Sequence, residues 1–305
     1  MRILVTGSEG FLGVVLCKML KRNGHEVVPF DLLNGQNILD KKQLSSALSN
    51  CQACIHLAAI ADLYEAEDAP EKTYQINVEA THVLLDLAEE KKIRLLFAST
   101  VCAYGNNGNP INQEDSPLAP TEVYAASKVM AEALFRERLE KHAILRLATF
   151  YGPGMRSSLA TSVFLKAIIH GQEVNIHGDG QQTRCYTHVE DIASGILAVL
   201  EADANGIFNI SSEQEVSVVE LIQIISQLTG KEAKINFVEE RFGQIFQSRN
   251  SIEKLKSLGW SPKYNLLSGL ETCLLEYQFK DWTNMIVHHR FEGPVGLLLR
   301  THLDL

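Results

Sequence analysis

The chain opens with a glycine pattern that leaves few choices for its fold. An apolar run at residues 2–6 leads into Gly7, Gly10 and Gly13, and a helical pattern then continues to about Arg22. Gly7 permits a tight turn after a strand, Gly10 has no side chain to block a pyrophosphate, and Gly13 lets the helix lie close to a sheet. The N-terminus of that helix would direct amide N–H groups at the phosphates. This strand, turn and helix together predict a dinucleotide site.

A carboxylate ends the second predicted strand, at residues 26–30. Asp31 is suited to accept hydrogen bonds from a ribose diol, and it would repel the 2′-phosphate of NADP. No arginine follows it closely to offset that repulsion. NAD is therefore the expected cofactor.

Strand and helix patterns alternate through the first half of the chain. Continuous apolar runs at 53–57, 94–98 and 143–147 are separated by helical patterns at 71–91 and 123–142. Strands without polar alternation are typical of a parallel sheet that is covered on both faces. The sequence therefore predicts an α/β fold with a doubly wound parallel (Rossmann) sheet and right-handed crossovers.

The pattern becomes less regular in the second half, which indicates a smaller mixed α/β substrate domain. Ser217 and Glu220 have the spacing of a capping box at the start of a helix over 217–228. The expected units are a Rossmann domain over 1–151 to which strands from about 183–212 return, a substrate domain over 152–182 and 213–280, and a C-terminal tail over 281–305 without usable periodicity.

Composition argues against several other kinds of protein. The 28 Lys and Arg against 37 Asp and Glu give a net charge of −9, without the dense basic cluster of a nucleic-acid binder. No apolar run reaches the roughly 18 residues of a membrane span, and a strand that begins at Arg2 leaves no room for a signal peptide. A cytoplasmic protein with reduced cysteines is expected. Cys51 and Cys54 have no second ligand pair nearby, so no metal is expected.

A tyrosine and a lysine share one face of the helix predicted over 123–142. Tyr124 and Lys128 are four residues apart. A free tyrosine has a pKa of about 10, and a nearby ammonium together with a positive nicotinamide ring would stabilise the tyrosinate. Ser99 and Thr100 end the preceding strand, at the sheet edge where ligands lie in this architecture. Thr100 could therefore share the proton of a substrate hydroxyl with Tyr124.

These residues, with several further stretches, resemble extended short-chain dehydrogenases/reductases of the NAD-dependent epimerase/dehydratase family. Members of that family act on nucleotide sugars, and the resemblance covers roughly residues 2–280. The stretches that carry it are Thr6–Gly13, Asp31, His56–Ala59, Asn77–Thr81, Ser99–Thr100, Tyr104–Gly105, Tyr124–Lys128, Arg146–Pro153, Gly178–Arg184 and His188–Asp191.

The resemblance implies roles for individual residues. The catalytic hydroxyl, base and lysine would be Thr100, Tyr124 and Lys128. The NAD contacts would be Gly7, Gly10, Phe11, Leu12, Gly13, Asp31, Asn37, Ile38, Leu57, Ala58, Ala59, Asn77, Ser99, Tyr124 and Lys128. The substrate, a nucleotide-diphosphate sugar, would meet Thr149, Arg184, Arg241 and Cys102.

The chain departs from the family pattern in places that bear on the reaction. Thr149 stands where an asparagine usually bonds the substrate, and Gln244 stands where an aspartate follows the arginine at 241. The turn after Thr100 lacks the Asp-Glu pair of 4,6-dehydratases and the glutamate of nucleotide-sugar decarboxylases. Those eliminations need an extra acid or base near C5 or C6 of the sugar.

The main hypothesis that the resemblance implies is 4-epimerisation of a nucleotide sugar through a transient 4-keto intermediate. Cys102, two residues after Thr100, resembles the cysteine of GDP-sugar 3,5-epimerases, although Gly154 stands where an assisting histidine would be. A 4-keto-sugar reductase or 3,5-epimerase is therefore the alternative, and a non-catalytic NAD-binding scaffold is a third reading. A homodimer that pairs the helices over 71–91 and 123–142 is also implied.

Overall fold

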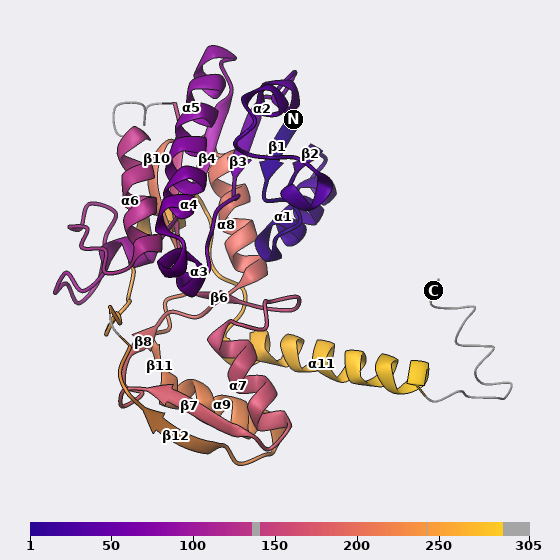
Figure 1. Ribbon diagram of the computed structural model, residues 1–305, viewed down its shortest axis with the longest axis vertical. Coiled ribbons are helices and arrows are strands. Elements are labelled where there is room, and N and C mark those ends of the chain that lie inside the picture. Colours follow the sequence, from indigo (N-terminus) through magenta and orange to yellow (C-terminus); the bar gives the residue numbers. More distant parts are fainter. Residues whose placement is uncertain (136–140, 242, 289–305) are drawn as a thin grey trace, which may run out of the picture.

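A six-stranded parallel sheet forms the centre of the molecule (Figure 1). The computed structural model describes residues 1–135, 141–241 and 243–288. The strands run in the order β10-β5-β4-β3-β1-β2. Their bounds are β1 (Arg2–Thr6), β2 (Glu26–Phe30), β3 (Ala53–His56), β4 (Arg94–Thr100), β5 (Ala143–Leu147) and β10 (Gly206–Ile210). The predicted doubly wound parallel fold is confirmed.

Helices cover both faces of this sheet. Helices α1 (Phe11–Arg22) and α8 (Val189–Glu201) pack one apolar core against it. Helices α2 (Lys41–Ala47), α5 (Ala80–Glu90) and α6 (Val123–Phe135) pack a second core on the other face. All five residues of β5 are buried, which explains why its sequence shows no polar alternation.

The strand order reverses beside β1. The chain passes from β1 outward to β2 and then crosses back to β3 on the other side of β1. In open parallel sheets, ligands bind in the crevice outside the carboxyl ends of the strands at such a reversal. The glycine loop after β1 and the loop after β3 both lie there.

The second half of the chain builds a smaller layered unit beside the sheet (Figure 1). A parallel pair, β7 (Glu173–His177) and β12 (Lys234–Val238), shares a core with α7 (Ala160–Ile169), α9 (Val218–Thr229) and α11 (Leu266–His288). Ser217 caps α9 in the predicted capping box with Glu220. The remaining short elements are β6 (Phe150–Tyr151), β8 (Thr183–Arg184), β9 (Thr187–His188), β11 (Val216–Ser217) and α10 (Glu253–Lys256).

The helix predicted over 71–91 is interrupted. It consists of α4 (Pro70–Tyr74), a π-helical turn (Gln75–Glu79) and α5, and a short helix α3 (Leu63–Asp68) precedes it. A π turn inserts one extra residue and often marks a functional site. Here it places Asn77, fully buried, against the loop that follows β3. Periodicity alone does not reveal this insertion.

Two further helix ends differ from the sequence prediction. Helix α6 is described to Phe135, so the predicted end near His142 falls beyond a stretch, 136–140, that lies outside the described residues. Helix α11 continues past Asp281 to His288, where the sequence suggested a tail, and residues 289–305 lie outside the described part. Helix α11 begins in the core that it shares with α7 and α9, and Figure 1 shows it running outward from there. No helix within the described residues is long and apolar enough to cross a bilayer.

Candidate active site

The glycine loop is closed to side chains at two positions and open at the third. A Cβ on Gly7, whose φ is +71°, would lie 2.8 Å from the Ala58 nitrogen, and one on Gly13 would lie 2.0 Å from the Gly7 carbonyl oxygen. A Cβ on Gly10 would meet only that same oxygen, at 3.2 Å, so space remains in front of this residue. Gly10 also caps α1, which directs the helix N-terminus into that space. The cradle fits the pyrophosphate of a dinucleotide.

Asp31 lies beside this loop, at the end of β2. Its Oδ2 accepts a hydrogen bond from the Glu9 backbone N–H at 3.0 Å, and its Oδ1 accepts one from Leu33 N–H at 3.0 Å. These bonds fix the carboxylate next to the phosphate cradle while the residue stays partly exposed. A carboxylate fixed beside the phosphate cradle can accept hydrogen bonds from a ribose diol, and its charge repels a 2′-phosphate.

The loop after β3, which contains Leu57, Ala58 and Ala59, is held from both sides. The Ala58 N–H donates to Thr6 Oγ1 at 3.3 Å, and Thr6 Oγ1 lies 2.7 Å from His56 Nδ1. Behind the loop, Asn77 accepts from the Ile60 N–H at 2.8 Å and donates to the Ile60 carbonyl at 3.0 Å.

The Asn77 amide also donates to Ser127 Oγ at 2.9 Å, which ties the loop to α6. All three hydrogen bonds of the Asn77 side chain are therefore to protein groups. Asn77, an expected NAD contact, therefore supports the loop after β3 from behind.

Thr100, Tyr124 and Lys128 meet at the carboxyl end of β4. Thr100 Oγ1 accepts from the Cys102 N–H at 3.1 Å, and the Thr100 side chain lies close enough to Tyr124 to lower the pKa of its phenol. Lys128 Nζ donates to the Ala98 carbonyl at 2.9 Å and lies 4.8 Å from the centroid of the Phe97 ring. The sequence-predicted trio is thus brought together at one sheet edge, next to the glycine cradle.

Burial sets the proton affinities of these groups. It raises the pKa of Tyr124 above its ordinary value, as does the neighbouring Cys102, while the nearby Thr100 side chain lowers it. Burial lowers the pKa of Lys128 to about 7, against the opposing effect of Glu132. A tyrosine of this kind needs a positive charge beside it to act as a base near neutral pH.

Ser99 faces away from this trio. Its hydroxyl donates to Glu132 Oε1 at 2.5 Å, and the same carboxylate binds the Arg146 guanidinium. No role was predicted for Glu132. Its spacing could have drawn attention to it, because Glu132 follows Lys128 by four residues and the two side chains share one face of α6.

The expected substrate residues gather across the crevice. Arg184 Nη1 donates to the carbonyls of Thr183 and Ile245, each at 2.8 Å. Burial raises the pKa of the Cys102 thiol, and the charges of Glu122, Arg184 and Arg241 also act on it, so these groups lie near the thiol.

Arg241 forms an ion pair with Glu122, a residue that the sequence analysis did not single out. The Glu122 side chain is 7% exposed, and burial raises its pKa while Arg241 lowers it. A pocket of about 440 Å³ beside this pair is lined by Asn106, Glu239, Glu240, Arg241, Gly243, Gln244 and Phe246. The pocket therefore opens beside one of the two arginines predicted to bind phosphate.

The other predicted positions fall around this core of the site. Thr149 is partly buried, and its carbonyl accepts from the Thr187 N–H at 2.9 Å. Phe11 stacks on Phe150 with ring centroids 5.5 Å apart, and Leu12 is buried under the sheet. Asn37 accepts from the Leu39 N–H at 3.0 Å, and Ile38 is packed in the core that α2 helps to form.

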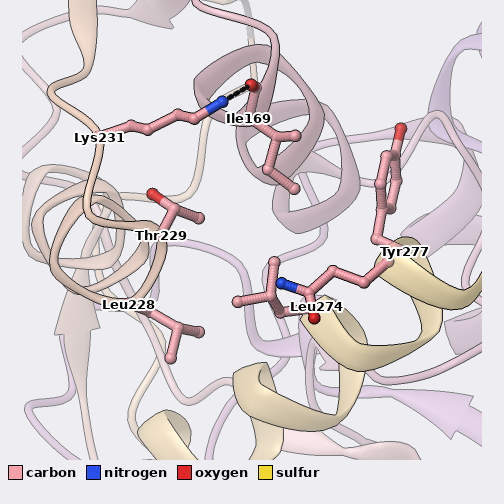
Figure 2. Close-up of a pocket in the computed structure, with 7 residues that line it drawn as sticks. Ile169, Leu228, Thr229, Lys231, Leu274 and Tyr277 are labelled. Atoms are coloured by element: carbon pink, nitrogen blue, oxygen red, sulfur yellow. Dashed lines mark hydrogen bonds between the residues drawn. The ribbon is translucent and has the colours of Figure 1, made fainter. Parts of the chain in front are cut away.

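A smaller pocket of about 190 Å³ lies elsewhere, between α7, α9 and α11 (Figure 2). Leu274 and Tyr277 of α11 line it, and Lys231 donates to the Ile169 carbonyl at its rim. None of the residues predicted for catalysis or binding takes part in it. Across the described ranges, no group of three or more His, Cys, Asp or Glu side chains could hold a metal ion.

Comparison with known proteins agrees with this geometry. Residues 3–211 match the NAD dependent epimerase/dehydratase family. The low-salt glycan biosynthesis protein Agl12 of Haloferax volcanii is 30% identical, over 91% of this chain and 98% of that protein. A UDP-N-acetyl-alpha-D-glucosaminuronate decarboxylase of Bacillus cytotoxicus is also 30% identical, over 90% and 96%. The crystal structure of a UDP-glucose 4-epimerase of Thermotoga maritima with UDP-glucose superposes with a TM-score of 0.86 at 28% identity, over 92% of this chain and 99% of that one.

The family match spans more than half of the chain and includes the glycine cradle, Asp31 and the trio at the end of β4. The cradle and the fixed carboxylate fit the cofactor that the family uses. The chain is therefore an enzyme of the NAD-dependent epimerase/dehydratase family, and its cofactor is NAD.

Proposed function

We propose that the protein is a nucleotide-sugar 4-epimerase. The observation that carries this proposal is the meeting of Thr100, Tyr124 and Lys128 at the end of β4, at the same sheet edge as the NAD cradle. NAD, when bound there, supplies an acceptor and then a donor of hydride for C4 of the sugar. The chain's own residues have to move one proton and to hold the 4-keto sugar while it turns its other face toward the nicotinamide.

The proton passes through Tyr124. Its phenolate takes the proton of the C4 hydroxyl as the carbonyl forms, and returns it when the carbonyl is reduced from the other face. Thr100 would donate a hydrogen bond to the C4 oxygen, and the Lys128 ammonium, one turn along α6 from Tyr124, would stabilise the phenolate. No net oxidant or reductant is consumed in the cycle.

The substrate diphosphate would be held by Arg184 and Arg241. A guanidinium offers paired donors that match phosphate oxygens. Arg241 would have to exchange its bond with Glu122 for one with the phosphate, while Arg184 is oriented by two carbonyls of the protein. Thr149 offers a hydroxyl where a longer amide is usual in the family, so its side chain would reach less far toward the sugar.

The second candidate is a 4-keto-sugar reductase or a 3,5-epimerase that uses Cys102. The observation in its favour is that the Cys102 backbone N–H donates to Thr100 Oγ1 at 3.1 Å, and the charge of the thiol acts on Tyr124. Burial raises the pKa of this thiol, which favours a protonated cysteine that could donate a proton but is a poor base. Consumption of NADPH with a 4-keto nucleotide sugar would support this candidate, since 4-epimerisation consumes none.

Elimination reactions receive less support, although a relative of this chain is a decarboxylase. The turn after Thr100 consists of Val101, Cys102 and Ala103, which contain no carboxylate to act at C5 or C6. A non-catalytic scaffold is the third candidate, and the intact trio argues against it, because cofactor binding alone does not need a proton-transfer pair.

The first test is the Tyr124→Phe variant. Loss of the phenol should reduce turnover of the substrate by at least about 100-fold while NAD content changes little, because the cradle is untouched. A Tyr74→Phe variant, which removes an exposed phenol from α4, serves as the matched control. If the wild-type protein converts no member of a broad nucleotide-sugar panel, the scaffold reading gains support over the epimerase.

A further inference from the structure

A buried carboxylate lies directly behind the reacting groups. Glu132 is 2% exposed and is enclosed between α6, β4 and β5. Its Oε1 accepts from Ser99 Oγ at 2.5 Å and from Arg146 Nε at 3.0 Å, and its Oε2 accepts from Arg146 Nη2 at 2.7 Å. A buried ion pair of this bidentate kind is costly to break, because the remaining charge would be left without a partner.

Arg146 is itself held in place by further groups. Its Nη1 donates to the Tyr104 hydroxyl and to the Glu114 carbonyl, each at 2.9 Å. The Tyr104 hydroxyl in turn donates to Asn209 Oδ1 at 2.7 Å. The guanidinium also lies 4.8 Å from the centroid of the Tyr104 ring. Glu132 is therefore anchored to β5, to β10 and to the turn after β4.

This anchor reaches the catalytic trio by two short paths. Ser99 immediately precedes Thr100 in β4, so its bond to Glu132 fixes the end of that strand against α6. Lys128 precedes Glu132 by one turn of α6, on the same face. The Ser99–Glu132 hydrogen bond therefore helps to hold the end of β4, with Thr100, against the helix that carries Tyr124.

Glu132 also acts on Lys128 through its charge. Burial lowers the pKa of Lys128 to about 7, and Glu132 raises it. The group that faces Lys128 from another element is His56 on β3, and burial lowers the pKa of His56 to about 3, so it is neutral near pH 7. Tyr124 on the same helix is protonated in the resting site, because burial raises its pKa. Arg146 on β5 is the cation that pairs with the Glu132 carboxylate. Within the described residues, Glu132 is therefore the anion whose charge acts on Lys128 in the resting site.

We propose that Glu132 is a positioning residue for the reaction, which fixes the end of β4 against α6 and keeps Lys128 charged near neutral pH. Its effect on turnover rests on the proposed function, whereas its effect on Lys128 does not. The test therefore measures both. Neither effect would follow if the Glu132–Arg146 pair served only to stabilise the fold.

The main variant is the double substitution Glu132→Gln/Arg146→Met, which removes the pair without leaving a buried charge. Replacing a buried pair by neutral side chains is often tolerated. The matched control, Glu213→Gln/Lys256→Met, removes an exposed pair whose atoms are 2.6 Å apart, remote from the trio. Glu132→Asp retains the charge with a shorter side chain. All variants are compared as NAD-loaded proteins.

The first readout is the titration of Lys128, followed by the ¹³Cε shift of labelled lysine and assigned with Lys128→Arg. The double variant should titrate about one pH unit lower than the wild type, whereas Glu132→Asp and the surface control should titrate as the wild type does. Equal midpoints in the wild type and the double variant, or an equal fall in Glu132→Asp, would overturn the proposal. If the double variant does not fold, Glu132→Gln alone takes its place in this measurement.

The second readout is the pH profile of kcat. The high-pH limb should move down with the Lys128 midpoint, so that kcat near pH 7.5 falls about tenfold while KM and NAD content stay within twofold. An unchanged profile in a folded double variant would overturn the proposal. If no sugar is turned over by the wild type, the proposed reaction is wrong, and the Lys128 titration still decides the role of Glu132.

Discussion

Two glycines of the cradle depend on residue type alone. Only glycine fits at Gly7 and Gly13, where a Cβ would meet backbone atoms at 2.8 and 2.0 Å. The contribution of Glu132 and Glu122 could not be recognised in the same way. Their significance comes from contacts with Arg146 and Arg241, which are distant in sequence and carry no spacing rule.

Asp31 provides a prediction for the cofactor. An Asp31→Ser variant should bind NAD roughly 10-fold more weakly, since a charge-assisted hydrogen bond contributes about 1.5–3 kcal/mol, and it should bind NADP better than the wild type does because a repulsive charge is removed. Fluorescence titration with both reduced cofactors measures the two affinities. Unchanged preference for NAD would show that Asp31 only organises the loop through Glu9 and Leu33.

The strands of the sheet were predicted well, because their apolar runs follow from burial. The helix over 71–91 was predicted less well, because a π turn interrupts it. The strands β1, β2 and β5 have the predicted bounds. In β1 and β5, burial on both faces leaves a continuous apolar run, whereas β2 lies at the sheet edge and is partly exposed. The π turn before α5 was missed, because it is stabilised by the bonds of Asn77 to the loop after β3. No local sequence pattern encodes a contact between those two segments.

A buried histidine links three of these elements and makes their packing sensitive to pH. His56 on β3 lies 2.7 Å from Thr6 Oγ1 on β1 and 2.9 Å from Thr81 Oγ1 on α5. Burial, followed by the charge of Lys128, lowers its pKa to about 3. In the unfolded chain His56 has an ordinary pKa and is protonated below a pH of about 6.5. In the folded protein it stays neutral down to a pH of about 3, so protonation between these values favours the unfolded chain.

The free energy of unfolding should therefore fall as the pH drops from about 6.5 toward 3, by roughly 1.4 kcal/mol for each pH unit. Urea denaturation at pH 7.5 and pH 5 measures this loss. A His56→Gln variant, which keeps polar atoms but does not titrate, should lose about 2 kcal/mol less between these two conditions than the wild type. An equal loss in both proteins would mean that other groups dominate the pH dependence.

At the scale of the whole molecule, the topology joins distant segments at one sheet edge. The cradle follows β1, the trio lies between β4 and α6, and the two arginines come from the second half of the chain. Alternation of strands and helices predicted this edge as the site. The approach of Arg184 and Arg241 to Cys102 could be expected only from the family resemblance, since the second half lacks a regular pattern that would place it.

The net charge of −9 is compatible with the proposed binding of two diphosphates, because both proposed binding sites are local. One is a helix N-terminus behind a glycine loop, and the other is a pair of arginines. Both depend on geometry within the crevice and not on the charge of the surface as a whole. Specificity among nucleotide sugars is therefore expected to depend on the crevice residues, Thr149 and Glu122 included.

The central claim is that hydride leaves C4 of the sugar and returns to it within the site. Incubation of the enzyme with UDP-glucose, UDP-glucuronate and related nucleotide sugars in D₂O, followed by ¹H NMR, tests this directly. The account predicts inversion at C4 of one of these sugars, without deuterium at any carbon and without net reduction of NAD. Deuterium at C3 or C5, loss of CO₂, or loss of water from the sugar would contradict it.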